Sequence, residues 1–433
     1  MQKKRGLVAV LVCIGVLFVF VQTVFAGDEV ERLMELLLKK KIITEKEYRE
    51  LKTEMNGMTQ KKDVQAEEGG AVEMQGWKDR ISVSGAIEGE FRWQRHRDIT
   101  DAASDSMTDL YVRRLELGIT ASPAEWIEAS VVLNSEWIGD DLNAGDEEIA
   151  VDEATVTLGD DDFPVYLVAG KRTQPFGVYE NHLITDPATQ DAYETKRVGL
   201  TAGYQGPPGL DVSVTVYKGE EQMNHLFESG LFAESIQRRA DAASDEVSSY
   251  IVSTSVTPVD DSFTVFASYL SEPGWGRRND TIGVGFNLEA PFLENLRIDA
   301  EYMKALKREH YEGLNAEFKE SVFSISAAYE FVLRKRKVIG GGLFAERKAH
   351  MMSEPLEVAL RYEHFNDDGL AEATGTWSIK DRYSGGVRYS FYNDETSGLN
   401  AFVGVEYRKT RYRTYTPMTD SNDEVYTRLG VGF

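Results

Sequence analysis

Charged side chains occupy every second position in several segments of the sequence, and they are the residues best suited to bind a solute. In RISVSGAIEGEFRW, Glu88, Glu90 and Arg92 alternate with Ile87 and Phe91. The same parity predicts one charged face elsewhere, made of Arg114, Glu116, Arg297, Asp299, Glu301, Glu357, Arg361, Glu363, Arg388, Glu406 and Arg408. Both signs occur together, which suits a polar or zwitterionic solute. Most of these charges are expected to pair with one another and stiffen the sheet that carries them.

Residues for catalysis or metal binding form no recognisable set. The six histidines are scattered, and none has metal-ligand spacing with another (His96, His182, His225, His310, His350 and His364). The sequence contains no nucleophile motif and no glycine-rich phosphate loop after a strand. A Ser-His-Asp site of the outer-membrane phospholipase kind stays open, with His364 as its histidine, because triads are defined by geometry. We expect no enzyme activity and no cofactor.

Apolar residues at alternate positions predict β-strands over most of the chain. The hydrophobic period is two from Trp77 onward, as in Tyr111, Leu115, Leu117 and Ile119. Sixteen strands are predicted, beginning near residues 80, 108, 125, 149, 164, 194, 209, 247, 262, 280, 295, 320, 355, 381, 399 and 423. The segment 333–354, with RKRK and GGG, is too long for a short turn, so eighteen strands remain an alternative.

The connections between these strands alternate in length. SPAE, GDDDFP, QGPPG, TPVDDS and EAPFLEN are short turns, whereas 94–107, 134–148, 172–193 and 218–246 are longer polar segments. Tyrosines near strand ends match an aromatic girdle (Tyr204, Tyr250, Tyr269, Tyr302, Tyr329, Tyr362 and Tyr407). A soluble β-sandwich or β-helix would need no such bands. The pattern favours an all-β fold, a transmembrane antiparallel β-barrel of about sixteen strands over 77–433.

The N-terminal residues predict export. Residues 1–26 combine a basic start, an apolar run and small residues before Gly27, which is typical of a signal peptide; an uncleaved anchor is the alternative. Cys13 is the only cysteine and lies in that run, so the exported chain must be stabilised by a large fold rather than by disulfides. The net charge of -24 argues against a nucleic-acid partner.

A short helical segment is predicted between the signal and the barrel. Residues 27–56 have helical periodicity and a capping box from Thr44 to Glu47, and the polar residues 57–76 form a linker. The helices either pack on themselves as a hairpin or form a periplasmic coiled coil that sets a homo-oligomer such as a trimer. This segment is too short for a plug domain inside the barrel.

The last residues, EVYTRLGVGF, alternate up to the C-terminus. Val425, Leu429, Val431 and Phe433 share one face, as expected for the final strand of a closed barrel in contact with outer-membrane lipid. A terminal aromatic at this position resembles the signal by which the outer-membrane assembly machinery recognises its clients. We therefore expect Phe433 to serve as an assembly signal in the cell outer membrane.

The loop after the fifth predicted strand is the most distinctive segment. Its length allows it to fold into the lumen as a constriction. Three motifs follow one another here: VDEATVTLG at 151–159, AGKRTQPFG at 169–177, and DPATQDAYETKR at 186–197. In this order they resemble the LbtU-type siderophore porins, over roughly residues 150–205. The family usually has a glycine where this chain has Tyr193. The helical preface is similar to those of phosphate-selective porins.

The resemblance implies passage of ferric siderophores through the barrel without an energy-coupled plug. Because siderophore complexes are often anionic, Lys171, Arg172, Lys196 and Arg197 are candidate cation donors near the constriction. Arg92, Arg114, Glu116, Arg361 and Arg388 are the lumen candidates. A general or anion-selective porin, such as one for phosphate, is the competing function. A structural barrel that tethers the envelope is a third.

Overall fold

The computed structural model describes residues 80–433, apart from gaps at 141–147, 161–162, 208, 234–235, 237–245, 260–261, 291–292, 294, 312, 315, 341–347, 395–397 and 416–417. The chain divides into two units, Met1–Arg80 and Ile81–Phe433. The predicted signal peptide (1–26), helical segment (27–56) and linker (57–76) lie outside the described residues. The barrel prediction can therefore be compared with the structure, and the N-terminal predictions stay predictions.

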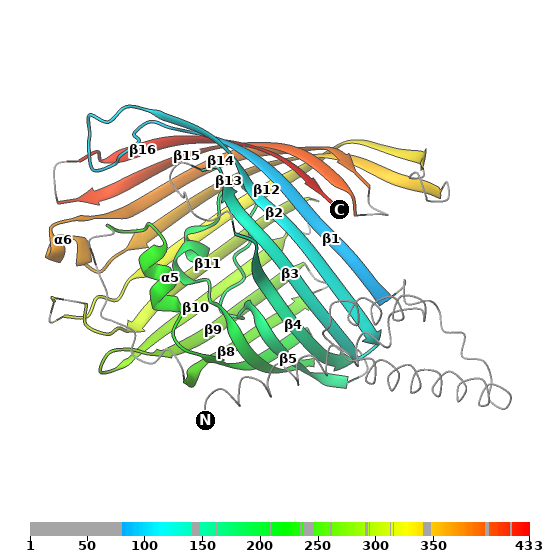
Figure 1. The fold of residues 1–433 in the computed structure, drawn as a ribbon, viewed down its shortest axis with the longest axis horizontal. Coiled ribbons are helices and arrows are strands. Elements are labelled where there is room, and N and C mark those ends of the chain that lie inside the picture. Colours follow the sequence, from blue (N-terminus) through cyan, green and yellow to red (C-terminus); the bar gives the residue numbers. More distant parts are fainter. Residues whose placement is uncertain are drawn as a thin grey trace, which may run out of the picture. The chain divides into compact units, whose positions relative to one another are not determined.

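Sixteen antiparallel strands form one closed barrel, which confirms the predicted fold class (Figure 1). The strands are β1 (Ile81–Gln94), β2 (Met107–Ala124), β3 (Ile127–Ile138), β4 (Ala150–Asp160), β5 (Phe163–Thr173), β6 (Lys196–Gly206), β7 (Leu210–Lys218), β8 (Val247–Val259), β9 (Phe263–Pro273), β10 (Arg278–Glu289), β11 (Leu296–Lys307), β12 (Ser321–Gly340), β13 (Lys348–Asn366), β14 (Trp377–Asn393), β15 (Asn400–Thr414) and β16 (Ser421–Gly432). Each strand pairs with its sequence neighbours, and β1 pairs with β16. Both ends of the barrel segment lie at the short-turn end, which is the periplasmic end in such barrels.

The segment 333–354 is part of one long hairpin rather than an extra pair of strands. β12 and β13 stay paired from Arg334 opposite Glu354 to Gly340 opposite Lys348, after a register shift next to Val332. Figure 1 shows this yellow hairpin reaching past the neighbouring strands. Sixteen is therefore the strand number, and β13 begins at Lys348 instead of near 355.

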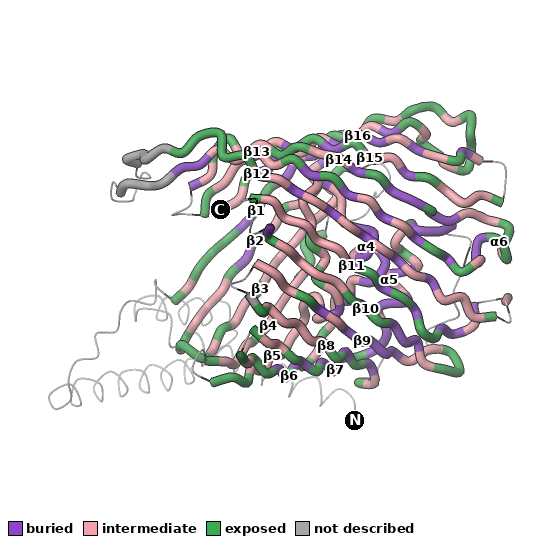
Figure 2. The backbone as a smooth tube through the Cα atoms, turned by 180° about the vertical axis from the view of Figure 1, so that it is seen from behind, coloured by how far each residue is buried: buried purple, intermediate pink, exposed green. Residues whose placement is uncertain are grey.

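The two faces of the barrel differ as the alternation predicts (Figure 2). On β1, Ile87 is 53% exposed, whereas its neighbours Glu88 and Glu90 are buried. Exposed apolar side chains around the barrel form the surface that contacts lipid. Of the predicted girdle, Tyr204 and Tyr329 lie toward the short-turn end, and Tyr250, Tyr269, Tyr302, Tyr362 and Tyr407 lie toward the long-loop end. Among the described residues, no helix is both long and apolar enough to cross a membrane.

Two short helices follow strands of the barrel and pack against each other. The loop between β5 and β6, residues 174–195, is called L3 and contains α4 (Ala188–Tyr193); the loop after β7, called L4, contains α5 (Gln222–Glu228). Neither helix has a cap from its own side chains. Glu363 of β13 accepts a hydrogen bond from the Ala188 N–H, and Glu272 of β9 accepts one from the Gln222 N–H at 3.1 Å. The wall thus supplies the anions that helix N-termini favour.

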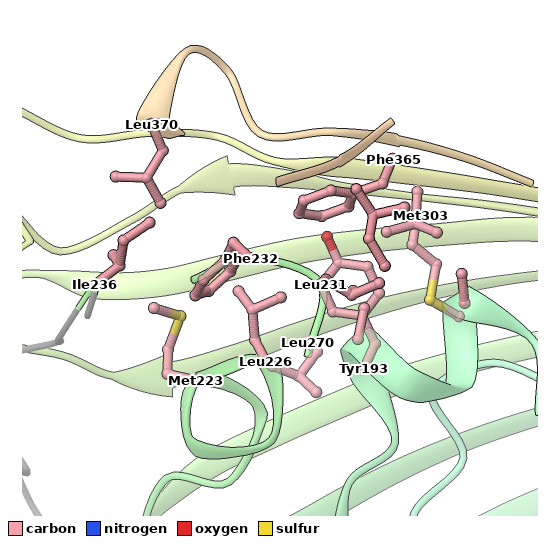
Figure 3. Close-up of a cluster of buried hydrophobic side chains, with 14 of the residues drawn as sticks. Tyr193, Met223, Leu226, Leu231, Phe232, Ile236, Leu270, Met303, Phe365 and Leu370 are labelled. Atoms are coloured by element: carbon pink, nitrogen blue, oxygen red, sulfur yellow. The ribbon is translucent and has the colours of Figure 1, made fainter. Parts of the chain in front are cut away.

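An apolar core, which the sequence pattern did not predict, lies inside the barrel. Phe176 and Tyr193 of L3, and Met223 and Leu226 of α5, are buried in it. Inward residues of the wall complete this core, namely Ile251, Leu270, Met303, Val322 and Phe365 (Figure 3). Burial of these side chains, worth about 1.5–3 kcal/mol each, holds the two loops to one side of the lumen.

The barrel closes at its final residue. The Phe433 N–H donates to the Gly85 carbonyl at 3.0 Å, and the Gly85 N–H donates to the Phe433 carbonyl at 2.8 Å. A methyl group on Gly85 would lie 2.6 Å from the Phe433 ring and 2.9 Å from the Glu116 carbonyl oxygen. Glycine is therefore required at this seam, and the role of Phe433 as an assembly signal stays a prediction.

Substitution of the seam glycine tests this closure. We expect Gly85→Ala to destabilise the barrel by about 1–3 kcal/mol because the added methyl overpacks the seam. Gly89→Ala is the matched control on the same strand, since no atom lies within 4 Å of the added methyl. The measurement is the urea midpoint of refolding in lipid, with heat-modifiable migration in SDS gels. Equal urea midpoints for the two variants would contradict the close packing inferred at Gly85.

Candidate functional site

L3 leaves the wall between β5 and β6 and crosses the lumen to the opposite strands. The Val178 N–H donates to Glu301 of β11 at 3.0 Å. Farther along, Arg382 of β14 binds Asp191 of α4 at 2.5 Å. Burial raises the pKa of Asp191, and Arg382 opposes that effect. The loop after the fifth strand therefore folds inward, as its length predicts, and it is fixed by contacts to strands far away in sequence.

The centre of L3 is held by an arginine and a glutamate of the wall. Arg361 of β13 donates to the Thr185 carbonyl and to its hydroxyl, both at 2.9 Å. Glu406 of β15 accepts the Ile184 and Thr185 N–H groups at 2.8 Å and the Thr185 hydroxyl at 2.7 Å. Because Glu406 is fully buried, these charge-assisted bonds fix the loop rather than a solute.

A histidine adds a titratable contact between L3 and the wall. His182 Nε2 lies 2.6 Å from Asp299 Oδ2, and its Nδ1 lies 3.8 Å from Glu357 Oε2. Burial alone would lower the pKa of His182, but hydrogen bonds to the two carboxylates outweigh burial and raise this pKa from 6.5 to about 9. At neutral pH the imidazole is protonated and attracts both carboxylates.

A cavity of about 580 Å³ remains between L3 and the other side of the wall. L3 contributes Asn181, His182, Leu183, Ile184, Asp186, Gln190 and Glu194. The charged wall residues are Glu88, Arg113, Arg114, Glu116, Glu136, Asp152, Lys196, Arg388 and Arg428. This opening, with both charge signs on its lining, is the candidate functional site.

Most cations of the cavity are paired with carboxylates. The pairs are Arg113 with Glu136 at 2.9 Å, Arg114 with Glu88 at 2.7 Å, Lys196 with Asp152 at 2.8 Å, and Arg428 with Glu90 at 2.6 Å. Among the arginine and lysine side chains of this lining, only Arg388 has no ion pair with a described residue. The expected internal pairing is seen for Arg114, and Arg113, Lys196 and Arg428 are paired as well, whereas Arg388 differs from them.

The four nominated constriction cations have separate surroundings. Only Lys196 lines the cavity. Arg172 donates to the Thr201 hydroxyl at 3.0 Å, Arg197 binds Glu221 at 2.5 Å, and Lys171 donates to the Val151 carbonyl at 2.6 Å. All four lie at the loop end of the β5–β6 pair, where Arg172 is opposite Arg197 and Thr173 is opposite Lys196, but they do not converge on the cavity.

The lumen candidates divide by role. Arg114, Glu116 and Arg388 line the cavity. Arg361 is buried under L3, and Arg92 is buried near the loop end, 3.0 Å from Asp140. Burial of this kind suits a residue that positions the loops more than one that meets a solute.

Sequence parity misplaces one stretch of β2. The register passes from Glu88 opposite Arg114 to Gly89 opposite Val112, so Arg113 is an extra residue in a β-bulge. Arg113 consequently lines the cavity, and Tyr111, predicted on the lipid face, is buried and donates to Glu90 at 2.5 Å. An arginine within an apolar face was the only sequence signal for this bulge.

Residues with catalytic or metal-binding chemistry do not form a site in the described part of the chain. Within it, no group of histidine, cysteine, aspartate or glutamate side chains can hold a metal ion. His364 binds Asp381 at 2.9 Å, but no hydrogen bond joins it to a described serine. Within these residues the triad alternative therefore lacks a serine that is hydrogen-bonded to its histidine.

Removal of the central L3 anchor tests whether the loop sets the opening. We expect Glu406→Ala to raise single-channel conductance and current noise. Two loop N–H groups lose their acceptor, and each unsatisfied donor costs about 1–3 kcal/mol of loop stability. Glu116→Ala is the control, since that carboxylate binds Arg114 and not the loop. Planar-bilayer recordings make the comparison. Wild-type conductance and noise in Glu406→Ala would exclude this role.

Alkaline pH should loosen the same loop through His182. The pKa of His182 is about 9 in the folded protein and 6.5 in the unfolded chain. The stabilisation from the imidazolium contact is therefore complete below pH 6.5 and is lost as pH rises through 9. We expect wild-type current noise to increase between pH 7 and 10. His182→Gln should show no such rise, because glutamine does not titrate. An equal increase in the variant would assign the effect to other groups.

Comparisons with known proteins agree on the fold. No family model matches the sequence. A UPF0422 protein of Coxiella burnetii is 23% identical over 356 residues, covering 78% of this chain and 67% of that protein. The outer membrane channel DcaP of Acinetobacter baumannii is similar with a TM-score of 0.54 and 11% identity over 82% of this chain and 97% of its own.

Two further solved structures are similar to this chain in fold, with low sequence identity. Salmonella typhi OmpF, in complex with daunomycin, has a TM-score of 0.53 and 15% identity, covering 82% of this chain and 97% of its own. Pseudomonas putida OprB has a TM-score of 0.52 and 10% identity, covering 82% and 95%. These identities establish the fold alone, so the resemblance to siderophore porins stays a prediction. The chain has the porin fold of bacterial outer-membrane channels.

Proposed function

We propose that this protein is a constricted diffusion channel of the outer membrane for small polar solutes, with ferric siderophores as its leading cargo. The observation that carries the proposal is the cavity of about 580 Å³ left between L3 and the wall. A sixteen-strand barrel is wide enough for an aqueous passage. L3 and L4 narrow that passage from one side, so the solute meets a short charged opening.

The lining supports a solute with both polar and charged groups. Acidic residues of L3, Asp186 and Glu194, face the same cavity as Arg114 and Arg428 of the wall. A solute that carries both charges finds partners on either side, whereas a strongly charged one meets repulsion as well as attraction. The siderophore assignment itself rests on the motif resemblance over residues 150–205.

An anion-selective porin is the second candidate. The specific observation in its favour is Arg388, whose exposed side chain forms no ion pair with a carboxylate among the described residues. One unmatched cation at a constriction attracts anions and biases permeation. The envelope-tether alternative depends on residues 28–56, which lie outside the described residues, and it stays a prediction.

Transport assays separate these functions. We expect deletion of the gene to reduce growth on a ferric siderophore as sole iron source, with restoration by the wild-type gene. Purified protein in liposomes should admit small sugars and exclude large ones, because the constriction limits size. Growth that is unchanged by deletion would reject the siderophore role. Strong anion selectivity that saturates with phosphate would favour the second candidate.

A further inference from the structure

The arginine that lacks a partner is available for a solute. Arg388 of β14 lines the cavity with an exposed side chain, and no hydrogen bond or ion pair joins it to a residue in the described ranges. Glu357 lies opposite it in the register, but that carboxylate binds Arg297 and lies near His182. The guanidinium therefore keeps its N–H donors free for a group in the cavity.

A buried ring holds this guanidinium in place. Arg388 Cζ lies 3.9 Å from the centre of the Phe402 ring. Phe402 is 7% exposed and lies against Gly430, where an added methyl would be 2.4 Å from the ring. The glycine thus lets the ring lie close to β16, and the cation–π contact orients the arginine before any solute arrives.

Apolar atoms lie beside the charge. Leu183 and Ile184 at the centre of L3 line the same cavity. Both side chains pack directly on glycines of the wall. A methyl group added to Gly386 of β14 would lie 2.8 Å from Leu183, and one added to Gly404 of β15 would lie 3.4 Å from Ile184. These two strands also carry Arg388 and Phe402. One cation therefore shares the cavity lining with aliphatic side chains, a combination that a bare inorganic anion would use only in part.

We propose that Arg388 and Phe402 form a binding subsite for small organic carboxylates with a planar apolar body, of the aryl carboxylate class. The planar guanidinium binds a carboxylate through two parallel N–H donors, while the body of the solute covers Leu183 and Ile184. This inference rests on the proposed function and adds a substrate class to its constriction.

Block of single-channel current by benzoate tests the subsite. The wild-type channel in planar bilayers should show benzoate block at lower concentration than acetate or phosphate block. Arg388→Gln should raise the half-blocking benzoate concentration about tenfold or more, because a charge-assisted hydrogen bond is lost. Arg388→Lys keeps the charge but not the flat fork, so benzoate block should weaken more than acetate block.

Arg114→Gln is the matched control because it removes one positive charge from the same cavity. It should leave benzoate block closer to the wild-type value, since Arg114 is already paired with Glu88 and Glu116. The subsite would be overturned if Arg114→Gln weakened benzoate block as much as Arg388→Gln does, or if benzoate did not block the wild-type channel. Conductance in potassium chloride shows that each variant is folded and open. Absence of wild-type conductance would instead refute the proposed channel.

Discussion

Hydrocarbon offers no partner for a backbone N–H or C=O, and the rest of this structure follows from that constraint. A sheet that crosses a membrane must pair every edge, so β1 must meet β16. The pairing continues to Phe433, where the chain ends at the seam beside Gly85. Closure at this point allows no larger side chain, which explains why a small residue stands there. The strand period of two then assigns one face to lipid and the other to the lumen.

A closed barrel of this width does not fill its own interior. The lumen is filled on one side by L3 and L4, which build an apolar core against inward residues of strands from β7 to β14. Short helices cannot stabilise themselves in this position. Glu363 and Glu272 of the wall accept hydrogen bonds from the N-termini of α4 and α5 and fix both helices. Many inward charges therefore have a structural role, and the size of the opening depends on them.

Sequence periodicity predicted the strands well because lipid contact imposes it on every strand. It also placed Arg114, Glu116 and Arg388 inside, and loop length indicated that L3 folds inward. Arg113 and Tyr111 were missed because a bulge adds one residue and reverses the parity. The core formed by L4 was missed because its apolar residues meet strands distant in sequence. The sequence did not predict which cations lie at the constriction or which of them form no ion pair. Both depend on how the loops pack against strands that are distant in sequence.

The charged residues that point into the lumen include some that hold the loop and some that can meet a solute. The two kinds differ in whether another residue of the protein binds the charge. Arg361 is buried and bound to L3 on several sides, so its charge is matched by the protein. Arg388 lies one strand away, but it rests on an aromatic ring and not on a carboxylate. A ring orients the guanidinium without neutralising it, whereas a carboxylate would do both. An arginine that is oriented by a ring and forms no ion pair with a described residue is therefore the member of the lining best prepared to bind an anion.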